Sequence, residues 1–201
     1  MVLSDKDIEI AHQKGEIIVK PLFPNSTQPS SVDLHLGKHF MVFENSKTTC
    51  IDPRESVEHL MKKVSLTKKN SFFVLHPGEF ALGITYETVG VNAEYCGNFQ
   101  GLSSLGRLGL AVHITASILN PGNTLNMTLE LFNFTNLPLK LYYKMPIAQI
   151  QFLKLSSPAK IAYDSVKSNS YVGSKVPVPS QYYKNFLDGK NDWMDFGDDL
   201  K

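Results

Sequence analysis

Two segments of the chain contain the residues best suited to chemistry. The first, GLSSLGRLGL at residues 101–110, has two adjacent hydroxyl groups, Ser103 and Ser104, followed by a single arginine, Arg107. The second, MTLEL at residues 127–131, places Glu130 in an otherwise apolar run. Burying a carboxylate among apolar side chains costs free energy unless a partner compensates for it. A buried Glu130 would therefore be either a structural group paired with an arginine or a group held ready for proton transfer.

The alternation of the second segment supports a simpler interpretation. Thr128 and Glu130 fall on one face of a strand, and the apolar residues Met127, Leu129 and Leu131 fall on the other. By itself this pattern favours an exposed carboxylate, a single arginine is most often a surface residue, and two serines beside glycine are typical of loops. Taken separately, these residues do not identify a site.

The composition is that of an ordinary globular protein and argues against several classes. The 201 residues are 42% hydrophobic and 19% charged, with a formal net charge of +1, so we expect neither nucleic acid nor membrane as a partner. Cys50 and Cys96 are isolated and the six histidines are scattered, so neither a disulfide framework nor a tetrahedral zinc site is predicted. No segment resembles a signal peptide or reaches the ~18 apolar residues of a membrane span, so we expect a cytoplasmic location.

Short β-rich runs separated by turns must position the candidate residues. A helix is predicted at the start, where Ser4 and Asp7 resemble a capping box and Gly15 ends the helical pattern. Residues 47–69 are expected to form an insertion or a short helix with a loop. The strand-like runs have almost no helical pattern between them, which indicates an all-β barrel or sandwich. They lie at residues 15–21, 30–43, 70–89, 108–119, 127–135, 139–143 and 147–155.

Taken together, these motifs resemble those of the dCTP deaminases in the trimeric dUTPase-like superfamily. The resemblance rests on residues 101–122 and 128–152, supported by SSVDLHLG at 30–37, FVLHPGEFALGITYETV at 73–89 and the run at 163–186. It implies a mainly β fold, a distorted dUTPase-like β-barrel with a short N-terminal helix. It also implies a homotrimer with active sites at subunit interfaces. The barrel domain would span residues 1–160, and residues 161–201 would form a C-terminal lid and acidic tail.

The resemblance also implies roles for individual residues. Glu130 would activate water for attack at cytosine C4 and then protonate the leaving ammonia. Ser103 and the main-chain carbonyl of Ala116 would hold this water, with Arg107 next to the glutamate and the nucleotide. The other implied substrate-binding positions are Asn120 near the sugar, Thr128 and Gln149 around the pyrimidine, Tyr163 at the phosphates, and Leu102, Ser104, Leu105, Gly106, Leu129, Ser170 and Ser174.

The chemistry of the residues agrees with this resemblance on one independent point. Cytosine deamination usually uses a zinc-bound hydroxide, with an H-x-E and P-C-x-x-C signature that this sequence lacks. A deaminase on this chain would then be metal-free at the reacting carbon, with a carboxylate as general base and fixed dipoles to position water. Mg²⁺ would enter only as the counter-ion of a nucleoside triphosphate.

Positions around the ligand depart from the family pattern and leave the reaction open. Leu102 stands where Lys or Arg is usual, Asn120 replaces an aspartate, and Ser170 and Ser174 stand where Lys and Gln are common. Each lost cationic phosphate contact would weaken binding by about 1.5–3 kcal/mol. The leading prediction is deamination of dCTP to dUTP and ammonia. The alternatives are a bifunctional enzyme that forms dUMP, which Asn120 disfavours because it cannot act as a base, and a related pyrimidine-nucleotide-binding protein with altered or lost activity.

Overall fold

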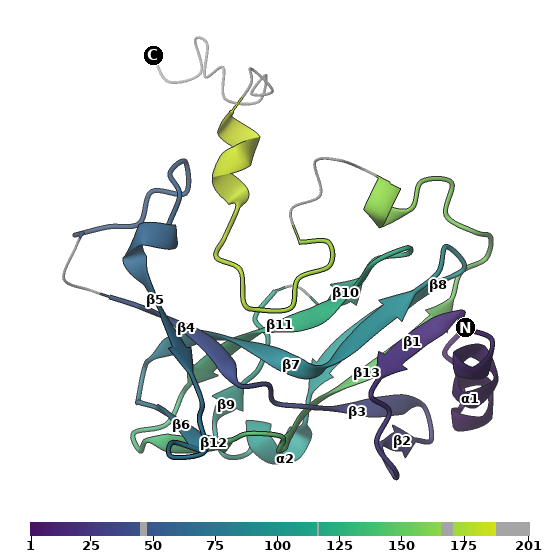
Figure 1. Ribbon diagram of the computed structural model, residues 1–201, viewed down its shortest axis with the longest axis horizontal. Coiled ribbons are helices and arrows are strands. Elements are labelled where there is room, and N and C mark those ends of the chain that lie inside the picture. The colour runs from purple at the N-terminus through teal and green to yellow at the C-terminus, as the bar shows by residue number, and fades with distance from the viewer. Residues whose placement is uncertain (45–47, 116, 166–170, 188–201) are drawn as a thin grey trace.

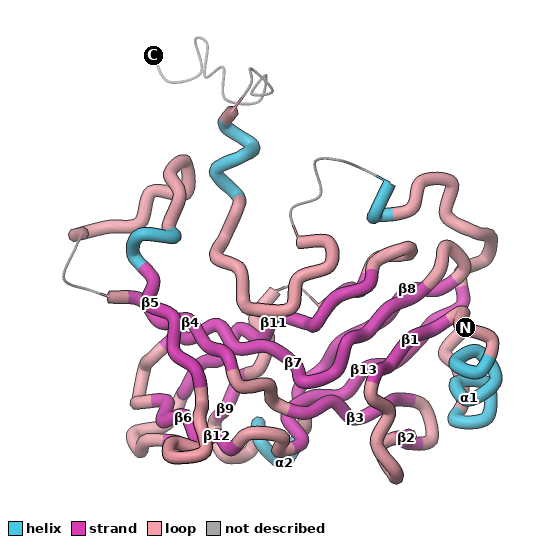
Figure 2. The backbone as a smooth tube through the Cα atoms, viewed as in Figure 1, coloured by secondary structure: helices cyan, strands magenta, loops and turns pink. Residues whose placement is uncertain are grey.

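The fold is mainly β, as predicted, and consists of two facing sheets with a small third one (Figures 1 and 2). The computed structural model describes all residues except 45–47, 116, 166–170 and 188–201. Within the described residues the two main sheets do not join into one closed barrel, so the distorted barrel takes the form of an open sandwich.

The first sheet carries Glu130 in one of its central strands. Its strands pair in the order β5-β4-β7-β11-β9, and β1 pairs with the far end of the long strand β7. These strands are β1 (Ile17–Lys20), β4 (His39–Phe43), β5 (Met61–Ser65), β7 (Phe80–Val91), β9 (Leu110–Ala111) and β11 (Thr124–Asn133).

The second sheet pairs its strands in the order β10-β8-β13-β3-β2, and β12 pairs with β6 in a separate two-stranded ribbon. All of these pairings are antiparallel. The strands are β2 (Thr27–Gln28), β3 (Ser31–His35), β6 (Phe72–Leu75), β8 (Tyr95–Gly101), β10 (Ile118–Leu119), β12 (Leu139–Tyr142) and β13 (Pro146–Lys154).

A main hydrophobic core fills the space between the sheets, and Met41, Met61 and Leu82 form a second, smaller cluster. Alternating residues of β11 and β13 point into it, which is why these strands read as half-buried in the sequence. Phe40 and Phe73 stack with their ring centroids 4.3 Å apart. The largest fully buried side chains are Phe40, Phe99, Phe152, Ile8, Ile17, Leu34, Leu36, Met41, Leu75, Ile84, Leu119 and Leu129.

The predicted N-terminal helix is confirmed as α1 (Asp5–Gln13). Ser4 is its N-cap, and its Oγ accepts a hydrogen bond from the main-chain N–H of Asp7 at 3.3 Å. The helix buries Ile8 and Ala11 against the core. Gly15 follows it with a left-handed φ of +73°, a conformation that suits glycine.

Two regions differ from the strand pattern expected from the sequence. Residues 47–69 contain a 3-10 turn at Glu58–Leu60, as the expected short helix, but also the strand β5. Residues 108–119 form only the ends of the expected strand, β9 and β10, and the serines before them begin a one-turn helix, α2 (Ser103–Gly106). The intervening loop turns back towards Glu130, and this long-range contact is not encoded in local periodicity.

Candidate active site

Glu130 lies half-buried on the face of β11 that points away from the core. Its Oε2 accepts hydrogen bonds from the main-chain N–H groups of Ile114, at 2.7 Å, and Thr115, at 3.1 Å. The main-chain N–H of Glu130 donates to the carbonyl of Val112 at 3.0 Å, which ties the same loop to the strand. The carboxylate is therefore held in place by the loop rather than left free on an exposed face.

A cavity of about 590 Å³ lies over this carboxylate. It brings together four of the residues predicted from the sequence, namely Asn120, Thr128, Glu130 and Tyr163. Leu82 lines it too and is directly opposite Glu130 on β7, so an apolar wall adjoins the carboxylate. The rest of this wall comes from Phe43, Val57, Met61 and Phe80.

The C-terminal segment at residues 171–187 returns across β11 and closes one side of the cavity (Figure 1). The carbonyl of Ser174 accepts a hydrogen bond from the main-chain N–H of Asn126 at 2.8 Å, so Ser174 contacts the strand through its main chain. Tyr171 lines the cavity beside Tyr163, and burial, with a smaller contribution from Tyr171, raises the pKa of the Tyr163 hydroxyl. The Tyr163 hydroxyl is therefore a neutral hydrogen-bonding group near pH 7.

The serine segment lies elsewhere on the same chain. Leu102, Ser103, Ser104 and Gln149 line a second, more open hollow of about 480 Å³, and the Gln149 side chain accepts a hydrogen bond from Ser31 Oγ at 3.0 Å. None of these residues lines the cavity over Glu130. A single chain thus presents the predicted site as two separate halves.

The remaining predicted residues that the structure describes line neither of the two hollows. Arg107 is exposed directly after α2, where its main-chain N–H donates to the carbonyl of Ser103. Leu105 and Gly106 lie within α2, and the Leu129 side chain is fully buried in the core, which leaves only its main chain for a ligand. Ala116 and Ser170 lie outside the described residues.

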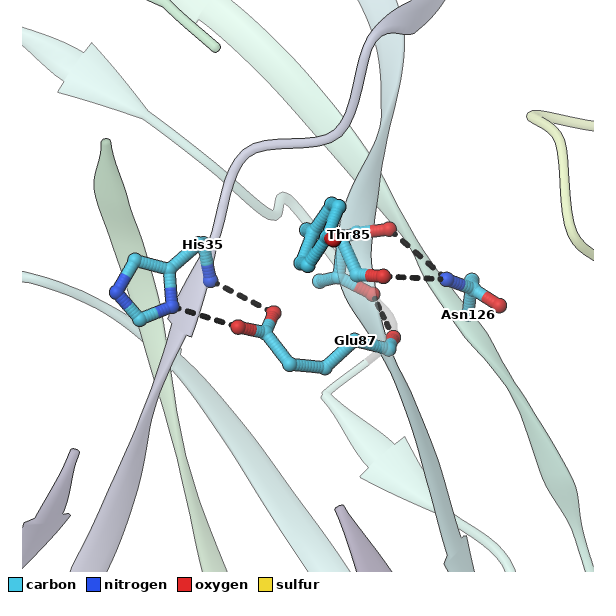
Figure 3. Close-up of polar contacts among 5 residues, drawn as sticks. His35, Thr85, Glu87 and Asn126 are labelled. Atoms are coloured by element: carbon cyan, nitrogen blue, oxygen red, sulfur yellow. Dashed lines mark hydrogen bonds and ion pairs between the residues drawn. The ribbon is translucent and has the colours of Figure 1, made fainter. Parts of the chain in front are cut away.

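Sequence reasoning missed a buried polar network between the two sheets (Figure 3). Glu87 of β7 is only 1% exposed and reaches His35 of the other sheet: its Oε2 accepts from the His35 main-chain N–H at 2.8 Å, and its Oε1 lies 2.6 Å from Nδ1. Burial raises the pKa of Glu87, and the hydrogen bonds from His35 oppose this rise. The only signal in the sequence was a polar residue at an apolar position of β7.

We expect His35→Ala to lower the free energy of unfolding by about 1–3 kcal/mol at pH 8, because it removes the side-chain partner of a buried carboxylate and leaves the main-chain hydrogen bond in place. A folded-state pKa above the unfolded value means that the contribution of Glu87 to stability is largest at low pH and is lost as pH rises. His35 favours the charged form of Glu87, and more of Glu87 is protonated at pH 5 than at pH 8. The loss of stability in His35→Ala should therefore be smaller at pH 5 than at pH 8 in urea titrations. His76→Ala, at an exposed histidine, is the control and should change stability by less than about 0.5 kcal/mol. Equal losses for the two variants would contradict the assignment.

The fold and the site define the class of this protein: two facing β-sheets with a carboxylate held at a cavity. Comparison with known proteins gives the family. A family model described as dCTP deaminase-like matches residues 2–155, and the chain belongs to this family. Among the described residues, no helix is long and apolar enough to cross a bilayer.

Individual relatives agree with this assignment. The chain is 45% identical over 187 residues to "dCTP deaminase, dUMP-forming" of Corynebacterium jeikeium, covering 92% of this chain and 99% of the relative. It is 44% identical to a protein of the same name from a Nocardioides strain, covering 92% and 97%. The crystal structure of 2'-deoxycytidine 5'-triphosphate deaminase from Agrobacterium tumefaciens superposes with a TM-score of 0.58 at 21% identity. That match covers 75% of this chain and about half, 47%, of the Agrobacterium chain, and it supports the fold.

Proposed function

We propose that this protein deaminates dCTP and releases dUMP, so that dCTP and two waters give dUMP, pyrophosphate and ammonia. The observation that carries the deamination step is the Glu130 carboxylate, held by two main-chain N–H groups at the edge of a nucleotide-sized cavity. The product is inferred from relatives at 43–45% identity that are named dUMP-forming. These names favour the bifunctional alternative over release of dUTP, the leading prediction from the sequence.

In the proposed deamination, Glu130 acts as both general base and general acid. It takes a proton from the water that attacks C4 of cytosine and gives a proton to the N4 amino group, which leaves as ammonia. Among the described residues the hydrogen-bond partners of the carboxylate all contact Oε2, which leaves Oε1 to face the water. The adjoining wall with Leu82 keeps bulk water away and strengthens these interactions.

The second step needs another water near the α-phosphate. Asn120 lines the cavity and can orient a water through its carboxamide, but it cannot take a proton from it.

We propose that two subunits complete each site. The hollow lined by Ser103 and Ser104 would face the Glu130 cavity of a neighbouring copy. Ser103 and Arg107 of one subunit would then meet Glu130 of the next within a homotrimer. The support is that the two halves line separate hollows on one chain, whereas the family resemblance assigns both to one nucleotide.

We propose that Mg²⁺ binds to the triphosphate of the nucleotide and not to a dedicated site on the protein. The described residues contain no group of three or more His, Cys, Asp or Glu side chains that could hold a metal ion. An ion that enters with the nucleotide would be held by phosphate oxygens and water, as is usual for Mg²⁺ bound with nucleotides. Its contribution would be to neutralise phosphate charge.

Product analysis tests the proposed function. Purified protein is incubated with dCTP and Mg²⁺, and ammonia, dUTP, dUMP and pyrophosphate are followed by enzymatic assay and chromatography. We expect ammonia, dUMP and pyrophosphate in equal amounts, without accumulation of dUTP. Ammonia with dUTP would restrict the activity to deamination. The absence of turnover with every pyrimidine nucleotide would leave a nucleotide-binding protein and overturn the proposal.

A further inference from the structure

The hydrogen-bonded ladder between β7 and β11 is interrupted just before the strand reaches Thr128 and Glu130. Asn126 lies opposite Thr88, but Thr128 lies opposite Ile84, so the three residues 85–87 of β7 face the single residue Met127. This bulge shifts the pairing by two residues. The register of Glu130 along β7 is therefore not a simple continuation of the register at Asn126.

Two side chains replace the missing ladder bonds (Figure 3). The Asn126 side-chain amide, through Nδ2, donates to the main-chain carbonyls of Thr85, at 3.0 Å, and Tyr86, at 3.2 Å. Thr85 Oγ1 accepts from the main-chain N–H of Met127 at 2.8 Å and donates to the carbonyl of Glu87 at 2.9 Å. Asn126 Oδ1 in turn accepts from Thr88 Oγ1 at 3.0 Å. The polar atoms of the Asn126 side chain are thus all used at the bulge.

The alternation of apolar and polar residues does not by itself determine the register of β11 on β7. A slip of one residue would turn the apolar face of β11 to solvent, whereas a slip of two residues keeps every side chain on its own face. A two-residue slip at the bulge would place Glu130 opposite Ile84 instead of Leu82, about 7 Å along the sheet. The alternation of apolar and polar residues would not oppose this movement, but a general base must lie within about 0.5 Å of its working position.

We propose that Asn126 is a positioning residue that sets the register at which Thr128 and Glu130 enter the cavity. It does not line the cavity itself, and it lies on the same face of β11, four residues before Glu130. Its amide holds the bulged carbonyls of β7, and this contact selects one of two registers that the hydrophobic pattern would accept. The inference rests on the proposed function, because it assigns to Asn126 the placement of the proposed general acid and base.

Asn126→Asp tests this role, because it keeps the shape of the side chain and removes both amide donors. We expect kcat for ammonia release to fall at least tenfold and KM for dCTP to rise, because Thr128 and Glu130 lose their places in the cavity together. Thr88→Val is the matched control: it removes the donor to Asn126 Oδ1 and leaves the contacts of Nδ2 in place. Its kcat should stay within twofold of the wild-type value.

A cross-link reports the register directly. Phe80 and Phe132 lie opposite each other in the native register. Directly opposed residues of antiparallel strands have Cα spacings within the range that a disulfide allows. In a Phe80→Cys/Phe132→Cys background, oxidation should give the linked peptide in high yield, measured by mass spectrometry. Adding Asn126→Asp should reduce this yield at least threefold, whereas adding Thr88→Val should not.

The outcomes separate this inference from the proposed function. If Glu130→Gln is inactive but Asn126→Asp keeps wild-type kcat and cross-linking, the positioning role is wrong and the proposed function stands. If Glu130→Gln keeps deaminating dCTP, the proposed function fails first. A loss of kcat in Asn126→Asp with an unchanged cross-link yield would also overturn the inference. If Asn126→Asp does not fold, Asn126→Ala is measured by the same two assays with the same expectations.

Discussion

Replacing Glu130 with glutamine is expected to lower kcat for ammonia release from dCTP by at least about 10³-fold, because the variant loses the group that takes up and returns the proton. Glutamine has nearly the same shape, and its side-chain oxygen can still accept from the N–H groups of Ile114 and Thr115. Folding and nucleotide binding should therefore be retained. Ammonia release gives the rate, and calorimetric titration with dCTP gives the affinity.

Glu9→Gln is the control for this substitution. Glu9 is an exposed carboxylate on α1, so the same change of charge is made far from the cavity, and kcat should remain at the wild-type value. A Glu130→Gln variant that binds dCTP and still releases ammonia at more than a tenth of the wild-type rate would remove Glu130 from the chemistry. The carboxylate would then have a structural role as the anchor of the 112–115 loop.

The sequence predicts the sheets well because their signals are local. Alternation along β3, β11 and β13 is a direct consequence of one buried face, and Ser4 with Gly15 marks the two ends of α1. The 108–119 run was wrong as a continuous strand. Its apolar residues are used partly to pack and partly to bend the chain so that Ile114 and Thr115 reach Glu130.

The candidate site was less accessible to sequence reasoning because its parts are far apart in the chain. The strand pattern alone placed Glu130 on an exposed face, and only the family resemblance gave it a chemical role. No role for Asn126 is predicted from the sequence. Its function depends on Thr85, 41 residues earlier, and on a bulge that no periodicity reveals. Contacts of this kind are set by tertiary pairing rather than by local preference.

The separation of the two halves on one chain leads to an expected result for mixed subunits. Ser103→Ala should lower kcat by about 10²-fold on its own, because it removes one group that positions the water, and Glu130→Gln should be inactive. In an equal mixture of the two, co-expressed with different tags and purified as mixed trimers, some sites combine an intact Ser103 with an intact Glu130. In a mixed trimer of either composition one of the three sites is of this kind, so about a third of the wild-type turnover should return.

Complementation separates a shared site from one built within a single chain. If Ser103 and Glu130 served the same site from the same chain, every site in the mixture would carry one defect and turnover would not exceed that of Ser103→Ala alone. A mixture of Glu130→Gln with Glu130→Ala is the control, because two variants that lack the same group cannot restore each other. Light scattering of the purified mixture verifies the assembly. A particle of 22.5 kDa, the mass of one chain, would contradict the trimer and with it the shared site.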